Sequence, residues 1–92
     1  MEMLAMATLI NKGYNPKRVG TWYLAAAIAH TARTGRPLMM TKEVYPEVAK
    51  QYNTSIVAVE RGIRTAIRDV TPEQSNSEVV RRIALEQMAH ED

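Results

Sequence analysis

The fold of this chain is decided by residues 45–68, which read YPEVAKQYNTSIVAVERGIRTAIR. The stretch predicts a short helix, a tight polar turn at Asn53-Thr54 and a longer helix. A core-facing stripe in the longer helix is expected from Ile56, Val59, Ile63, Ala66, Ile67 and Val70. On the opposite face, at about 100° per residue, lie Val57, Ala58, Arg61, Arg64, Thr65 and Arg68. A basic helix behind a short turn is the arrangement of a helix-turn-helix, whose second helix enters the DNA major groove.

The composition of this outer face bears on what it binds. Arginines on the outside of a helix are often only solvated, but carboxylates then normally interleave with them. Here Glu60 is the only acid between Ala49 and Arg68. Val57 and Ala58 suit contact with a thymine methyl group better than exposure to water. The residues favour DNA binding, but they leave open a protein-interaction domain that binds an acidic partner through the same surface.

Length and composition set further limits. A chain of 92 residues can bury one core, so we expect residues 1–92 to form a single domain. The absence of cysteine excludes disulfides and thiolate metal sites, and makes a reducing cytoplasm the expected setting. No apolar run approaches the roughly 18 residues of a membrane span, so no membrane partner is expected. The apolar residues 1–10 lack the basic start of a signal peptide and predict a core helix.

Charge is distributed unevenly along the chain. Residues 11–68 contain ten Lys and Arg against three acids, a balance of +7, whereas residues 69–92 contain two Arg against six acids, a balance of −4. A basic body suits a polyanion, and an acidic tail would be repelled by one. We therefore expect the tail to point away from bound DNA.

The first third of the chain predicts two helices. Residues 2–12 should form a helix that ends at Gly13 and buries Met3, Met6, Ala7 and Ile10. Residues 16–32 should form a second helix, capped by Asn15 and opened by Pro16. Its inner side is expected to carry Val19, Tyr23, Ala26, Ala27 and His30.

The remaining segments are also helical in pattern. Residues 38–40 predict an extended link, after which Thr41 could cap the next helix. Pro46 leaves two alternatives, since either the helix begins there or an early turn loses one hydrogen bond. Residues 71–77 predict a loop, and Ser75 with Glu78 forms a capping box. The last helix should then bury Val79, Ile83 and Met88. The expected fold is an all-α, compact bundle of five to six helices that contains the helix-turn-helix.

Residues suited to catalysis are scarce. His30 lies on the inner side of an alanine-rich helix, where a packing role is expected. Glu86 and His90 could share a metal ion, but two ligands hold a metal weakly, and a surface pair is the simpler interpretation. The four glycines form no phosphate-binding pattern. We expect no enzyme activity, no cofactor and no metal.

Basic residues outside the longer helix suit phosphate groups. Lys17 and Arg18 are expected in the first turn of a helix, where cations oppose the helix dipole. They are either a tolerated surface cost or a phosphate site at the free N–H groups. Arg36 and Lys42 precede the helix-turn-helix and could contact the DNA backbone in the same way.

Two strings, TKEVYPEVAKQYNT at residues 41–54 and VERGIRTAI at residues 59–67, resemble the C-terminal effector domain of the master sporulation response regulator of endospore-forming bacteria. Tyr23-Leu24 and Asn76-Ser77-Glu78 also match, so the similarity covers nearly the whole chain. The resemblance implies an all-α domain of six helices, or nearly so, that binds double-stranded DNA. It also implies head-to-tail self-association on tandem sites, with the last helix (residues 76–89) near the contact.

Individual positions carry over from the resemblance. The base- and backbone-contacting positions of the family fall on Glu60, Arg61 and Arg64. This chain departs from the family at Val57, Ala58 and Thr65, so its preferred DNA sequence can differ. The family's contact segment for RNA polymerase sigma factor is shortened here to about residues 70–74, which weakens the case for that partner. The chain contains no receiver domain, so it is either an excised effector domain or a stand-alone relative.

The sequence therefore predicts a sequence-specific, double-stranded DNA-binding transcription regulator. Arg61 and Arg64 should read base edges, most naturally guanine. Glu60 should accept from a cytosine amine or orient a neighbouring arginine. Contacts to the DNA backbone are expected from Lys17, Arg18, Arg36, Lys42, Lys50, Thr54 and Arg68, and Thr54 should also cap the recognition helix.

Overall fold

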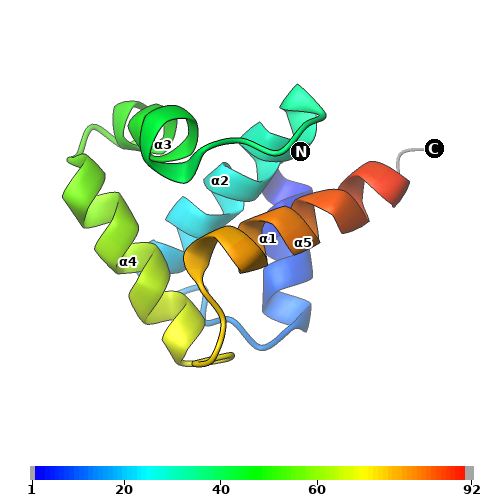
Figure 1. Cartoon of the computed structure of the whole chain (residues 1–92). Coiled ribbons are helices and arrows are strands. Elements are labelled where there is room, and N and C mark those ends of the chain that lie inside the picture. Colours follow the sequence, from blue (N-terminus) through cyan, green and yellow to red (C-terminus); the bar gives the residue numbers. More distant parts are fainter. Residues whose placement is uncertain (1, 91–92) are drawn as a thin grey trace.

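The computed structural model describes the backbone of residues 2–90 and the side chains of residues 2–89. Within this range the chain is all-helical, as the sequence predicts. Five α-helices and one π-helical turn follow in the order α1 (Glu2–Asn11), α2 (Val19–Thr34), η1 (Met40–Val44), α3 (Tyr45–Gln51), α4 (Ile56–Arg68) and α5 (Asn76–His90). Figure 1 shows α4 at one edge of the molecule and α5 crossing in front of α1.

Helix α2 forms the centre of the bundle because its small side chains allow neighbours on several sides. It contacts α1, α4 and α5. Residues 20–29 are buried apart from the half-buried Trp22. The alanine run at residues 25–27 combines strong helix propensity with little side-chain volume. Other helices can therefore approach the α2 backbone closely.

The closest approach joins α2 to α4 at two glycines. A Cβ built on Gly20 would lie 1.9 Å from the carbonyl oxygen of Gly62, so a side chain cannot fit. A Cβ on Gly62 would in turn meet the Tyr23 ring at 3.0 Å. The packing role of these two glycines is not evident from the sequence. Their contact sets the position of α4 against the rest of the bundle.

The buried face of α1 differs from the prediction. Ala5, Met6 and Leu9 are buried, whereas Met3 is 77% exposed and Ile10 is also exposed. Ala7 is exposed as well. The helix has apolar residues on both sides, and contact with α2 selects the side that carries Ala5 and Leu9. The helix ends at Asn11, one residue earlier than predicted, and Gly13 lies in the turn that follows, with a φ of +98°.

Helix α2 begins three residues later than predicted. The side chain of Asn15 accepts from the Lys17 amide over 2.9 Å and forms a turn, not a helix cap. Pro16 belongs to that turn, and its carbonyl accepts from Trp22 Nε1 over 2.8 Å. The helix starts at Val19, so Lys17 and Arg18 precede its first turn. Val19 itself is exposed and does not lie on the inner side of the helix as predicted.

The predicted link is present at residues 38 and 39, and a π-helical turn, η1, follows it before α3. Thr41 does not cap it, because the N-cap position is Met39. The Met39 amide instead donates to Glu43 Oε1 over 3.1 Å. Helix α3 begins at Tyr45, which places Pro46 in its first turn. Proline is tolerated in a first turn. Pro46 does not open the helical run, however, because η1 leads directly into α3.

The predicted turn between α3 and α4 is present, but the N-cap of α4 is not the predicted residue. Asn53 adopts a left-handed φ of +53°, as Asn tolerates better than most residues. The N-cap of α4 is Ser55, whose side chain accepts from the Ala58 amide over 3.0 Å. The prediction that Thr54 caps this helix is wrong. Thr54 is one residue early, and its amide donates to Ala49 O over 2.9 Å.

The core stripe of α4 is confirmed for its central members, Val59, Ile63, Ala66 and Ile67, which are all buried. Ile56 is 40% exposed, because it opens the helix beside the exposed turn. Val70 is half-buried and lies beyond the end of the helix. The stripe is thus shorter than predicted at both ends.

The capping box that opens α5 is confirmed. The Ser75 amide donates to Glu78 Oε1 over 2.9 Å, and the Glu78 amide donates to Ser75 Oγ over 3.2 Å. The Ser75 amide and hydroxyl lower the pKa of the Glu78 carboxyl, since both hydrogen bonds favour its ionised form. Of the predicted inner residues, Val79 and Ile83 are fully buried and Met88 is half-buried.

Candidate nucleic-acid interface

Helices α3 and α4 pack against each other in the order expected for a helix-turn-helix. The outer face of α4 is exposed as predicted, with Ala58 half-buried and Val57, Arg61, Arg64, Thr65 and Arg68 exposed. This face lies opposite the buried stripe of the same helix. A helix so divided presents a rigid basic surface, because its other side is fixed in the core.

Glu60 and Arg64 form an ion pair one helical turn apart on this face. Arg64 Nη2 donates to both carboxylate oxygens of Glu60. The hydrogen bond to Glu60 raises the pKa of the Arg64 guanidinium, which is charged at any physiological pH. Glu60 therefore holds Arg64 in the free protein, and both roles predicted for Glu60 towards DNA stay predictions.

Arg61 has different surroundings. It lines a hollow of about 250 Å³ together with Arg18, Val19, Gly20, Gly62 and Thr65. Gly20 and Gly62 line this hollow where α2 crosses α4, and Arg18 lines it from the segment before α2. No ion pair involves Arg61 among residues 2–89. Its guanidinium is thus available to a ligand without breaking an existing ion pair.

Arg18 is brought to the interface but is already paired. Its Nε lies 2.5 Å from Asp69 Oδ2. The prediction that Lys17 and Arg18 occupy the first turn of a helix is wrong, because Asn15 holds them in a turn outside it. Both side chains are exposed. Any contact that they make with phosphate therefore comes from their charge and not from a helix N-terminus.

A second hollow joins the recognition helix to the start of α5. It has a volume of about 610 Å³ and is lined on one side by Glu60, Arg64 and Arg68. Thr41 and Tyr45 line it from η1 and α3, and residues 74–77, at the junction of the preceding loop and α5, close it. The position of the start of α5 beside α4 is not evident from the sequence.

Asn76 joins the start of α5 to the helix-turn-helix by two hydrogen bonds. Its Nδ2 donates to Tyr45 Oη over 2.9 Å and to Glu60 O over 3.2 Å. Tyr45 is only 6% exposed, and burial raises the pKa of its hydroxyl. The sequence offered one signal for this site, the match of Asn76-Ser77-Glu78 to the resembled family, but it assigned no role to Asn76.

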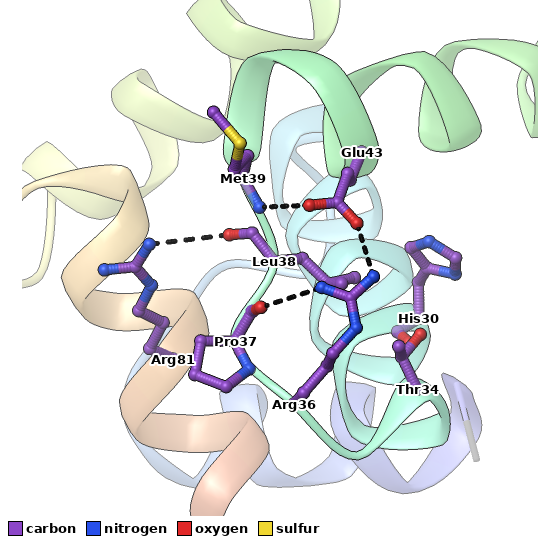
Figure 2. A network of polar contacts seen from close by, with 8 residues as sticks. All are labelled: His30, Thr34, Arg36, Pro37, Leu38, Met39, Glu43 and Arg81. Carbon is purple, nitrogen blue, oxygen red and sulfur yellow. Dashed lines mark hydrogen bonds and ion pairs between the residues drawn. The ribbon is translucent and has the colours of Figure 1, made fainter.

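Arg36 is engaged within the protein. Figure 2 shows its guanidinium between the Pro37 carbonyl and Glu43. It donates to Pro37 O over 3.3 Å and to Glu43 Oε2 over 2.8 Å. The pKa of the Glu43 carboxyl is lowered first by the Met39 amide and then by Arg36. The predicted contact of Arg36 with the DNA backbone would require it to leave its ion pair with Glu43.

The other predicted phosphate contacts are arranged around the helix-turn-helix. Lys42 is exposed on η1, Lys50 is exposed near the end of α3, and Arg68 is exposed at the end of α4. Thr54 is half-buried in the turn between the two helices. The fold thus brings the cations of α4, η1 and α3 to the same part of the molecule.

The residues considered for catalysis or metal binding are not brought together into a site in the part of the chain that the structure describes. His30 is half-buried near Arg36 in Figure 2. Glu86 pairs with Lys12 over 3.4 Å, and the side chain of His90 lies outside the described residues. Within the described part of the chain, no group of three metal-binding side chains occurs. None of the helices there is long and apolar enough to cross a membrane.

Comparison with known proteins supports a DNA-binding role for this surface. A search of curated proteins finds no match. A family model described as "Sporulation initiation factor Spo0A C terminal" matches residues 5–92. This is a family of DNA-binding domains and not of enzymes. The chain therefore belongs to the Spo0A C-terminal family, the DNA-binding part of a sporulation transcription regulator.

Proposed function

We propose that residues 1–92 act as one domain that recognises a specific sequence in double-stranded DNA by placing α4 in the major groove. The observation that carries this proposal is the exposed face of α4. It presents Arg61 and Arg64 about one helical turn apart, on a helix whose opposite side is buried. The smaller side chains of Val57 and Thr65 lie on the same face. A major groove about 12 Å wide admits such a helix.

Arg61 and Arg64 are assigned to base edges, where a guanidinium can donate to guanine O6 and N7. Arg64 is held by Glu60 in the free protein, which reduces the side-chain freedom that binding would remove. Glu60 then either keeps this orienting role or accepts from a cytosine amine.

Contacts to phosphate are assigned to the exposed cations Lys17, Lys42, Lys50 and Arg68. Arg18 and Arg36 are also assigned, although each must exchange a carboxylate partner for phosphate. Thr54 does not cap α4, but it is assigned to a contact with the DNA backbone because it lies in the turn before that helix.

The test is selection of bound duplexes from a random pool, followed by titration of the selected sequence at several salt concentrations. We expect an enriched sequence and an affinity that falls with salt at a log–log slope of about −0.9 for each phosphate contacted. Absence of binding at low salt would refute DNA recognition and favour an acidic protein partner. Binding without an enriched sequence would refute base recognition alone.

Self-association and the remaining partners belong to the same proposal. Two copies are expected to bind tandem sites head-to-tail with α5 near the contact, in the cytoplasm. Arg81 and Arg82 are exposed on α5, so their replacement by alanine should reduce cooperative binding to two adjacent sites. Unchanged cooperativity would exclude this part of α5 as the contact. A contact with RNA polymerase sigma factor is the weakest element, because residues 70–74 offer it little surface.

A further inference from the structure

The amide of Asn76 connects three helices. It is the first residue of α5, and it donates to Tyr45 Oη on α3 and to Glu60 O on α4. Because the Glu60 carbonyl can only accept, the amino group of Asn76 and not its carbonyl must face it. Both hydrogens of the amino group are then used, which fixes the side chain in one orientation.

The hydrogen bond from Asn76 to Glu60 O matters for DNA binding because of its position on α4. Glu60 O lies on the helical turn that carries Arg61 and Arg64, and the Glu60 side chain holds Arg64. Bidentate contacts with bases require donor groups placed to within about 0.5 Å. The hydrogen bonds of Asn76 are partly buried, so their loss leaves partly buried polar groups without this protein partner.

We propose that Asn76 is a positioning residue for base recognition, which fixes the turn of α4 around Glu60 against α3 and α5. Arg61 and Arg64 then meet base edges in one geometry. The inference rests on the proposed function, because it concerns discrimination between DNA sequences. Asn76 acts through Glu60 and Tyr45 and needs no contact with DNA.

A purely structural role must be separated from this one, since Asn76 also begins a helix. Asn76→Asp makes the distinction. Aspartate in the first turn favours the helix through its dipole, and it has nearly the same shape as asparagine. It cannot donate to Glu60 O, however, and it adds a carboxylate near that of Glu60. If Asn76 only started α5, this variant would fold and discriminate like the parent.

Two further variants control for charge and for the second hydrogen bond. Ser77→Asp adds the same charge in the same turn and beside the same hollow, but leaves the bridge from Tyr45 to Glu60 intact. Tyr45→Phe removes one acceptor and keeps the buried ring and the net charge. Thermal unfolding of each variant shows whether the fold is retained.

The experiment measures the affinity of the full chain for its selected duplex and for random duplex, and compares their ratio. We expect Asn76→Asp and Asn76→Ala to lower the ratio roughly two- to tenfold, as for lost hydrogen bonds. Tyr45→Phe should lower it less. Ser77→Asp should weaken both duplexes and leave the ratio unchanged. Amide hydrogen exchange in α4 should be faster in Asn76→Ala than in the parent.

Two results would overturn the inference while leaving the proposed function in place. One is an unchanged ratio in Asn76→Asp. The other is an equal loss on both duplexes in Asn76→Ala, which would make Asn76 a phosphate contact. A parent protein that selects no sequence would refute the proposed function, and the positioning role with it.

Discussion

Replacing Arg61 with alanine should weaken binding to the preferred DNA sequence while changing binding to random DNA little. Arg61 is exposed on the face of α4 opposite Ile63 and Ile67, and no ion pair within residues 2–89 depends on it. Its removal should therefore change the free energy of unfolding by less than about 0.5 kcal/mol. Arg64 is a poorer target, because its removal would also leave Glu60 unpaired beside the DNA.

The expected loss follows from the contact assigned to Arg61. A bidentate contact with guanine contributes about 1–3 kcal/mol of discrimination, which corresponds to roughly 5- to 150-fold in affinity. Random DNA seldom presents guanine at the matching position, so its affinity should fall only by the effect of one lost charge. The ratio of the two affinities is thus the quantity to measure, by fluorescence anisotropy with labelled duplexes at two salt concentrations.

Lys42→Ala is the matched control, since it also removes one exposed cation near the helix-turn-helix. As a phosphate contact, Lys42 should affect both duplexes by similar factors, and its loss should make the salt slope shallower by about one unit. Circular dichroism should show both variants folded. If Arg61→Ala binds the selected duplex as tightly as the parent, α4 does not read bases through this residue, and the position carried over from the family does not apply here.

Three further predictions concern stability. Gly20→Ala should destabilise the fold by about 1–3 kcal/mol or more, because the added Cβ meets Gly62 O; a melting temperature equal to the parent's would disprove the close crossing. Ser55→Ala should cost about 1 kcal/mol in urea denaturation through loss of the helix cap, and no cost would mean that the cap is unimportant. The pKa of Glu78 is lowered by the amide of Ser75, so its contribution to stability is present above pH 4.5 and is lost as the pH falls through the lowered pKa. Glu78→Gln should flatten this acid dependence of the melting temperature, and an unchanged dependence would contradict the assignment.

Local patterns in the sequence were sufficient for several features of the interface. The division of α4 into a buried and a basic face follows from helical periodicity, which is a property of residues near each other in the chain. The turn at Asn53 and the capping box at Ser75 likewise depend on side chains that bond to the adjacent backbone. Each of these features is complete within a few residues, so no knowledge of the rest of the fold is needed.

The structure differs from the sequence-based prediction where the residues allow two local solutions. Thr54 and Ser55 are both good cap residues, and the backbone at the start of α4 selects Ser55. Asn15 can cap a helix or form a turn, and it forms the turn that leaves Lys17 outside α2. Helix α1 has apolar residues on two sides, and only its contact with α2 decides which side is buried.

The sequence by itself determined that the chain is helical, that α4 is amphipathic, and which arginines lie on its outer face. Only the tertiary structure decided what surrounds those arginines. Gly20 meets Gly62 across α2 and α4, and Asn76 reaches Glu60 from the last helix. Such contacts join residues far apart in the chain, and they depend on how whole helices pack. Helical periodicity specifies the faces of a helix, whereas close packing of the assembled core decides what each face meets.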